Sequence, residues 1–225
     1  MHANVSRLDV EDVVALYSKY LPDLLKVRAE QRKLYESGLK AQLDDIEAEL
    51  TYLRLRETCP ATVVEMGSLY GWSTSWILRA LRDNEFGQLH SYDITANASV
   101  PAELASRWSF AQGDVREARL PEDIGYLFVD AAHTASFARW YLEAVFPGVS
   151  CPVSVHDVFH GRRALPLSEG SVVLKWLADK RISYFTASRK AAPGVYDRIM
   201  RHRAKLGLAE PIHSGHDNPM IFFQL

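Results

Sequence analysis

Cysteine is scarce in this sequence, net charge is close to zero, and no apolar run is long enough to span a membrane. The 225 residues include only Cys59 and Cys151, which do not form a metal-binding or redox spacing. The formal net charge of −2 gives no reason to expect nucleic acid or an anionic membrane as a partner. Because the first residues also lack the apolar core of a signal peptide, we expect a cytoplasmic protein.

Glycine and proline are nearly absent from the first 57 residues, where only Gly38 and Pro22 occur. Apolar residues there recur in alternating steps of four and three, a spacing typical of helices with a narrow apolar seam. The two series are Val10, Val14, Tyr17, Leu21 and Leu24, followed by Leu39, Leu43, Ile46, Leu50 and Leu53. We therefore predict an N-terminal helical segment, residues 1–58, as a hairpin broken at residues 36–38, with one continuous helix as the alternative. Its seam either packs on its own domain or serves as a lid or a homodimer contact.

From residue 59 the pattern changes to short apolar strands that alternate with helices. Strands are predicted at residues 62–66, 89–93, 108–112, 125–130, 153–157, 182–186 and 220–225. Such alternation is typical of a parallel sheet with helices on both faces. We therefore predict an α/β domain over residues 59–225, with a Rossmann-like, doubly wound, seven-stranded sheet whose last strand is reversed.

The turn after the first predicted strand lacks the glycines of a dinucleotide-binding loop. A loop that binds pyrophosphate reads G-x-G-x-x-G, and here Leu69 and Trp72 occupy the second and third glycine positions. The turn instead reads Glu65-x-Gly67-x-x-x-Gly71. The Glu65 carboxylate would repel a phosphate but would suit a ligand with an ammonium group. This pattern disfavours a Rossmann-type oxidoreductase and indicates a ligand that joins a nucleoside to an amino acid.

Acids and histidines follow most of the predicted strands. In a doubly wound sheet, ligands bind beyond the carboxyl ends of the strands. Asp93, 26 residues after Gly67, is placed to bind both hydroxyls of a ribose. Asp114, after the third strand, is placed to accept a hydrogen bond from an adenine amino group. The fourth strand ends in VDAAH and the fifth runs into VHDVFH, so His133 and His156 are expected at the same edge of the sheet.

Four segments together resemble a known enzyme family. VVEMGSLYGWST, LHSYDI, FAQGDV and YLFVDAAH, in this order and spacing, resemble motifs one to four of class I S-adenosylmethionine-dependent methyltransferases. VDAAH followed by VSVHDVFH resembles the small-molecule O-methyltransferase branch, which includes catechol-type and antibiotic-tailoring enzymes. The resemblance covers roughly residues 60–225. It implies methyl transfer from S-adenosylmethionine to a hydroxyl of a small molecule, and tailoring of a secondary metabolite fits it.

The resemblance also implies a set of cofactor-binding residues: Glu65, Gly67, Ser68, Leu69, Gly71, Ser73, Asp93, Asp114, Val115, Asp130 and Ala131. The first four would hold the methionine portion, and the two that follow belong to the turn and the helix start. Asp93 would bind the ribose, Asp114 with Val115 the adenine, and the last two residues would line the passage to the sulfonium. Alternatively, the Ser73 hydroxyl only caps the following helix and has no role in cofactor binding.

Methyl transfer is an in-line displacement, so the acceptor must be held close and deprotonated. In a metal route, Asp130, His156 and Asp157 would bind a divalent ion that lowers the pKa of the acceptor. The family has acidic or amide ligands where this chain has His156-Asp157, and a mixed set favours Mn²⁺, Fe²⁺ or Zn²⁺ over Mg²⁺. In a metal-free route, His133, His156 or His160 would act as general base, with Asp157 orienting a histidine.

Two rival functions are left open by the sequence. The chain could methylate nitrogen or carbon, or it could be a non-catalytic scaffold that keeps the fold and associates through residues 1–57. The gathering of His133, His156, Asp157 and His160 beside a cofactor pocket favours an enzyme, because a scaffold has no need of such ionisable groups. The expected partner is a small-molecule acceptor, held between the N-terminal helices and residues 95–107 and 159–172.

Overall fold

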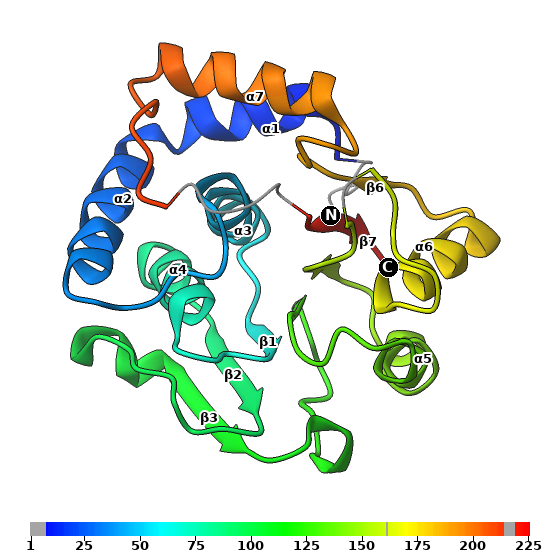
Figure 1. Cartoon of the computed structure of the whole chain (residues 1–225). Helices are drawn as coiled ribbons and strands as arrows, with labels where there is room; N and C mark the ends of the chain where they lie inside the picture. Colours follow the sequence, from blue (N-terminus) through cyan, green and yellow to red (C-terminus); the bar gives the residue numbers. More distant parts are fainter. Residues whose placement is uncertain (1–7, 161, 214–218) are drawn as a thin grey trace, which may run out of the picture.

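A seven-stranded sheet forms the centre of the computed structural model, which describes residues 8–160, 162–213 and 219–225 (Figure 1). The strands are β1 (Thr62–Met66), β2 (Gln88–Asp93), β3 (Trp108–Gln112), β4 (Tyr126–Val129), β5 (Pro152–Val155), β6 (Tyr184–Phe185) and β7 (Ile221–Gln224). Their order is β3-β2-β1-β4-β5-β7-β6. The first five are parallel to one another, whereas β7 runs antiparallel to both β5 and β6. The predicted doubly wound sheet with a reversed last strand is therefore confirmed.

Helices cover both faces of this sheet. They are α4 (Trp72–Asp83), α5 (Ala135–Ala144), α6 (Glu169–Lys180) and α7 (Pro193–Lys205), with short 3₁₀ helices η1 (Ala102–Arg107), η2 (Val115–Glu117) and η3 (Phe146–Gly148). Side chains alternate between two apolar cores, because successive strand residues point to opposite faces. Val63 and Phe222 belong to the core shared with α4, and Val64 and Phe223 belong to the core shared with α5 and α6. Figure 1 shows α5 and α6 together, apart from α4.

The N-terminal segment forms three helices, α1 (Val10–Lys19), α2 (Leu21–Glu36) and α3 (Asp45–Thr58), rather than the two of a hairpin. The second apolar series starts at Leu39, but the chain is not helical there, and α3 begins only at Asp45. Asp44 fixes this start with a capping box. Its side chain accepts from the Glu47 amide at 3.0 Å, while the Glu47 carboxylate accepts from the Asp44 amide at 3.3 Å. The helical nature of the segment is confirmed and α2 ends at the predicted break, but the segment has one helix more than a hairpin.

Helix α3 is buried on all sides and is part of the core. Its polar residues Asp45 and Glu49 lie in a buried ionic cluster with Arg28 of α2 and Arg203 of α7. The Arg203 Nε lies 2.8 Å from a Glu49 oxygen, and the Tyr17 hydroxyl donates to Glu49 at 2.7 Å. Figure 1 shows α7 lying along α1, which brings Arg203 to this cluster. The apolar spacing in the sequence predicts one narrow packed face, whereas every residue of α3 from Asp45 to Leu55 is buried.

Across the described part of the chain, no helix combines the length and the apolar character that a membrane crossing would need.

Candidate functional site

A cavity of about 800 Å³ opens beyond the carboxyl ends of β1, β2, β4 and β5. The described residues that line it are Ala41, Gln42, Gly67, Ser68, Leu69, Ser73, Tyr92, Asp93, Ile94, Thr95, Gly113, Asp114, Val115, Arg116, Asp130, Ala131, Ala132, His133, Thr134, Ser136, Phe137, His156 and Asp157. Nine of the eleven predicted cofactor-binding residues are in this set. Ala41 and Gln42 bring the N-terminal segment to the same cavity.

The turn between β1 and α4 needs glycine at two positions. Gly67 has a φ of 89°, and a Cβ atom there would lie 1.9 Å from the carbonyl oxygen of Asp130. Gly71, the N-cap of α4, has a φ of 94°, and its Cβ would lie 2.6 Å from the carbonyl oxygen of Ser99. The glycines therefore serve close backbone approach, so that β1 and β4 end side by side at the cavity.

Glu65 lies behind this turn and does not line the cavity. Its carboxylate is fully buried and accepts from the hydroxyls of Ser73, Thr74 and Ser91 at 2.6, 2.8 and 2.6 Å. Burial raises the pKa of Glu65 to about 7, although the three hydroxyls partly oppose the rise. The carboxylate reaches the cavity only through Ser73, which is a wall residue. Glu65 thus holds the Ser73 hydroxyl in place at the cavity wall.

Asp93 ties the glycine turn to the end of β2. One carboxylate oxygen accepts from the amides of Ser68 and Leu69 at 2.9 and 2.8 Å, and the other accepts from the Thr95 amide and hydroxyl at 2.9 and 3.0 Å. Burial alone would raise the pKa of Asp93, but these amide donors lower it. Asp93 therefore stays ionised at the cavity wall, where a ribose was expected.

Asp114 lines the same cavity one residue after Gly113, whose amide donates to the Asp93 carbonyl at 2.8 Å. It caps η2 by accepting from the Arg116 amide at 3.0 Å, and the Arg116 guanidinium binds its carboxylate. Hydrogen bonding to Arg116 lowers the pKa of Asp114 to about 2. Arg116 is itself a lining residue that the sequence reasoning missed.

Four of the predicted chemical groups converge at the ends of β4 and β5. His156 Nδ1 lies 3.1 Å from an Asp130 oxygen and 3.5 Å from an Asp157 oxygen. His133 Nε2 lies 3.5 Å from Asp130 and 3.4 Å from Asp157. His160, the remaining histidine of the predicted set, is exposed and pairs through its backbone with Arg163. It is not among the described residues that line the cavity.

Two buried glutamates that the sequence reasoning missed bind the histidines. Neither is among the described residues that line the cavity. Glu47 of α3 places a carboxylate oxygen 3.3 Å from His156 Nε2, and Glu169 of α6 places one 3.2 Å from His133 Nδ1. Both glutamates are 1% exposed. The capping pattern at Asp44 and Glu47 is visible in the sequence, but it predicts a helix start and no contact with a residue 109 positions away.

The cluster raises the pKa of both histidines. Burial alone would lower the pKa of His156, but the charges of Asp130 and Glu47 outweigh it and hold that pKa well above its usual range. Burial would also lower the pKa of His133, and here the hydrogen bond to Glu169 and the charge of Asp130 prevail. Burial would raise the pKa of Asp130, whereas His156 lowers it. The neighbouring charges therefore stabilise the charged form of each of these three groups.

Asp130, His156 and Asp157 also form a donor set that fits a divalent metal. One ligand atom from each lies within 4.8 Å of the others. His156 turns Nδ1 toward the two acids and Nε2 toward Glu47. With the Nε2 proton donated to Glu47, the Nδ1 lone pair is free for a metal, which is the usual carboxylate–histidine–metal arrangement.

Three non-glycine residues of the cavity wall have a left-handed backbone. The φ angles are 42° for Leu69, 34° for His133 and 54° for Asp157. Such conformations cost about 1–3 kcal/mol each and are retained mainly where function requires them. All three follow the end of a strand, so the strain coincides with the residues expected to contact ligands.

The sequence of this region matches a known family. Residues 64–158, from β1 to just beyond β5, match the family model of the methyltransferase domain. Residues 64–158 therefore match a methyltransferase domain. The methyltransferase domain predicted from the four strand-end motifs is thereby confirmed for this segment. None of the curated proteins gives a significant match to the sequence.

Solved structures share the fold of the methyltransferase domain. A Staphylococcus aureus protein assigned as a caffeoyl-CoA O-methyltransferase aligns with a TM-score of 0.54 and 12% identity, over 93% of this chain and 99% of that one. Cofactor-bound Rv0187 from MTB aligns with a TM-score of 0.51 and 16% identity, over 80% of this chain and 92% of that one. These likenesses extend beyond the matched segment and establish the Rossmann-like methyltransferase fold for most of the chain.

Proposed function

We propose that this methyltransferase moves the methyl group of S-adenosylmethionine to a hydroxyl oxygen of a small molecule. The observation that carries the proposal is the cluster of Asp130, His133, His156 and Asp157 at one end of a cavity of about 800 Å³. This volume lies within the range of small-molecule sites, and it leaves room for an acceptor beside the donor. The other end of the cavity carries the acids expected to bind a nucleoside.

The donor is proposed to lie along the β1 and β2 ends. The Ser73 hydroxyl and the amides of Ser68 and Leu69 would bind its methionine portion. Asp93 would bind the ribose hydroxyls, and it would do so by exchanging some of its present amide and hydroxyl donors. Asp114 with Val115 would bind the adenine, while the Asp130–Ala131 backbone would border the sulfonium.

His133 is the proposed general base. Its side chain is 38% exposed, and Nδ1 lies next to the buried Glu169. In the neutral ring, a proton on Nδ1 would be donated to Glu169, and the Nε2 lone pair would face the cavity to take the acceptor proton. Asp130 and Asp157, both near Nε2, would stabilise the imidazolium that forms.

A divalent metal is proposed for the neighbouring donor set. Asp130, His156 through Nδ1 and Asp157 would hold it, and Glu47 would keep His156 in the required tautomer. When bound, such an ion lowers the pKa of an acceptor oxygen. A site with one imidazole favours Mn²⁺, Fe²⁺ or Zn²⁺ over Mg²⁺.

The N-terminal segment is proposed to act as one wall of the acceptor site. Ala41 and Gln42, in the stretch between α2 and α3, border the cavity and support a lid role. A homodimer contact through the outer helices, a cytoplasmic location and natural-product tailoring are further proposals that follow from the sequence alone.

The first experiment is a calorimetric titration of chelator-treated protein with S-adenosylhomocysteine, with NAD⁺ as the control ligand. We expect saturable micromolar binding, none with NAD⁺, and weaker binding in Asp93→Ala. Turnover of catechols compared with matched anilines then tests the hydroxyl acceptor. Activity that returns with Mn²⁺ in wild type but not in Asp157→Ala supports the metal, provided that Asp157→Ala still binds S-adenosylhomocysteine. Absence of S-adenosylhomocysteine binding at millimolar ligand would refute the proposed donor site and favour a scaffold.

A further inference from the structure

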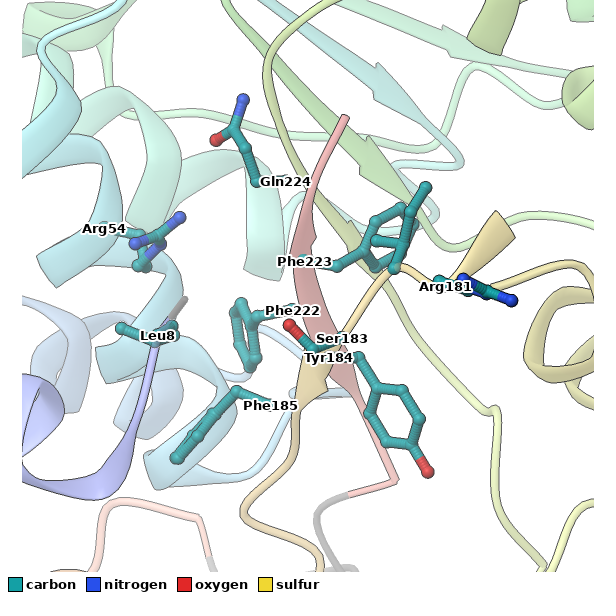
Figure 2. Close-up of a pocket in the computed structure, with 10 residues that line it drawn as sticks. Leu8, Arg54, Arg181, Ser183, Tyr184, Phe185, Phe222, Phe223 and Gln224 are labelled. Carbon is teal, nitrogen blue, oxygen red and sulfur yellow. The ribbon is translucent and has the colours of Figure 1, made fainter. Parts of the chain in front are cut away.

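A second cavity, of about 240 Å³, lies at the edge of the sheet where β6 and β7 pair. Figure 2 shows Arg54 of α3 together with Phe222 and Gln224 on one side of β7, while Phe223 and Arg181 lie on the other side. Phe185 of β6 lies on the Arg54 side as well. This cavity shares no residue with the methyl-transfer cavity among those the structure describes.

Arg54 is buried in the wall of this cavity without a partner for its guanidinium. The residue is 6% exposed, and beyond the backbone bonds of α3 its one hydrogen bond within the described ranges is the Thr58 hydroxyl donating to its carbonyl oxygen at 2.8 Å. Its charge does act on Glu57, but that carboxylate is already bonded to Lys19 at 2.6 Å and to Tyr20 at 2.9 Å.

The other buried arginines at this face are paired, which makes Arg54 the exception. Arg28 and Arg203 are 6% and 3% exposed, and both bind Asp45 and Glu49. Residues 1–7, which precede the lining residue Leu8, contain no Asp or Glu that could neutralise a guanidinium. A buried cation is costly unless an anion pairs with it, so the cavity lacks the anion that Arg54 requires.

Gln224 supplies a second buried atom without a partner. Its amide nitrogen donates to the Leu225 carbonyl at 3.0 Å, while its Oε1 is buried and bonds to nothing in the part of the chain described. Oε1 accepts but cannot donate, so it calls for a hydrogen-bond donor. Phe185 and Phe222, whose rings lie 6.5 Å apart, provide an apolar surface on the same side of the strand.

We propose that this second cavity binds a small organic anion with a carboxylate, an apolar ring or chain, and a hydroxyl or amino donor. The carboxylate would pair with the Arg54 guanidinium, the apolar body would lie against Phe185 and Phe222, and the Gln224 side chain would turn its buried Oε1 toward the donor. The volume suits a one-ring molecule, since a cavity of about 150 Å³ already accommodates benzene. A planar guanidinium favours a carboxylate because both can form two parallel hydrogen bonds.

This ligand site is independent of the proposed methyl transfer, although α3 and β7 extend from its walls toward the histidine cluster. Glu47 and Arg54 lie seven residues apart on α3, which is about 10 Å along a helix axis. On β7, the Met220 amide just before the strand donates to Glu47 at 3.0 Å, whereas Phe222 and Gln224 border the second cavity. The site is therefore an accessory one, outside the reach of the reacting groups.

The test is a calorimetric titration of the full chain with 4-hydroxybenzoate, alongside phenol and inorganic phosphate. We expect saturable one-site binding of 4-hydroxybenzoate, weaker by about 10-fold or more in Arg54→Met, because charge-assisted hydrogen bonds contribute that much. Gln224→Leu, which changes the β7 wall of the cavity, should also weaken binding. Arg139→Met, which changes an exposed arginine of α5 outside the lining of both cavities, is the matched control and should bind as wild type does.

Three outcomes would overturn the proposal. One is no saturation by 4-hydroxybenzoate up to about 10 mM in a protein that still binds S-adenosylhomocysteine. Another is binding of phosphate as tightly as 4-hydroxybenzoate, because the apolar ring of the ligand would then contribute nothing to affinity. The third is binding that survives Arg54→Met but is lost in Asp157→Ala, because the ligand would then occupy the methyl-transfer cavity. S-adenosylhomocysteine binding by Arg54→Met checks that this variant is folded.

Discussion

Replacing Glu65 with glutamine should remove a pH dependence of stability that wild type shows. Glu65 is fully buried and its pKa lies near 7 instead of the ordinary 4.5, because burial disfavours the charged form. In the unfolded chain the carboxyl ionises first. Below pH 4.5 its contribution to stability is fully present, and this contribution is lost as pH rises from 4.5 to about 7.

The size of the effect follows from the same two values. At about 1.4 kcal/mol per pH unit, a rise from 4.5 to about 7 corresponds to a loss of up to about 3 kcal/mol by pH 8. Glutamine fits the same space and keeps one carbonyl oxygen for the hydroxyls of Thr74 and Ser91. The Ser73 hydroxyl can turn to accept from the new amide. The variant should therefore fold and should gain on wild type as pH rises.

Urea denaturation of both proteins at pH 5 and pH 8 measures this difference. The unfolding free energy of Glu65→Gln minus that of wild type should be larger at pH 8 by about 2–3 kcal/mol. Glu143→Gln, which changes an exposed carboxylate on α5, is the matched control. Its unfolding free energy minus that of wild type should be the same at pH 5 and pH 8. A difference for Glu65→Gln that is the same at both pH values would refute the reasoning, since Glu65 would then ionise alike in the folded and unfolded chains.

Other variants test the turn, the buried ionic cluster and the proposed base. Gly67→Ala should destabilise the fold severely, because its Cβ would lie 1.9 Å from a carbonyl oxygen at the end of β4; a melting temperature equal to wild type would contradict this. Arg203→Met should lower the unfolding free energy by about 3–5 kcal/mol in urea titrations, because it removes a cationic partner of the buried Glu49, and a loss below about 1 kcal/mol would speak against the cluster. Glu169→Gln should lower kcat and shift the acidic limb of the pH–rate profile to lower pH, because the pKa of His133 falls when the neighbouring charge is removed. An unshifted limb would argue against His133 as base.

Much of the fold could be predicted because it depends on local pattern. The strands Thr62–Met66 and Trp108–Gln112 were predicted to the residue, since apolar or β-branched runs end there in glycine or acidic turns. The N-terminal helices were harder. Helix α3 buries its whole surface, including charged residues, so the spacing of its apolar residues could not indicate where it starts or how it packs.

The candidate site likewise contains residues whose positions could be predicted from the sequence and residues whose positions could not. Asp130, His133, His156 and Asp157 could be brought together from sequence because parallel strands end at one edge of the sheet. Glu47 and Glu169 could not, since each reaches its histidine from a helix whose position depends on long-range packing. Glu65 shows a third case: the residue is where the motif predicts, but Ser73, Thr74 and Ser91 take up its carboxylate.

The position of Glu47 has a consequence for how the protein is made. Its carboxylate bonds both to His156 and to the amide of Met220, which lies 173 residues further along the chain, directly before β7. A chain whose β7 has not yet been synthesised cannot form this contact. The histidine cluster therefore reaches its final geometry only after β7 has joined the sheet, and a variant that lacks β7 should accumulate as a partly folded, protease-sensitive species.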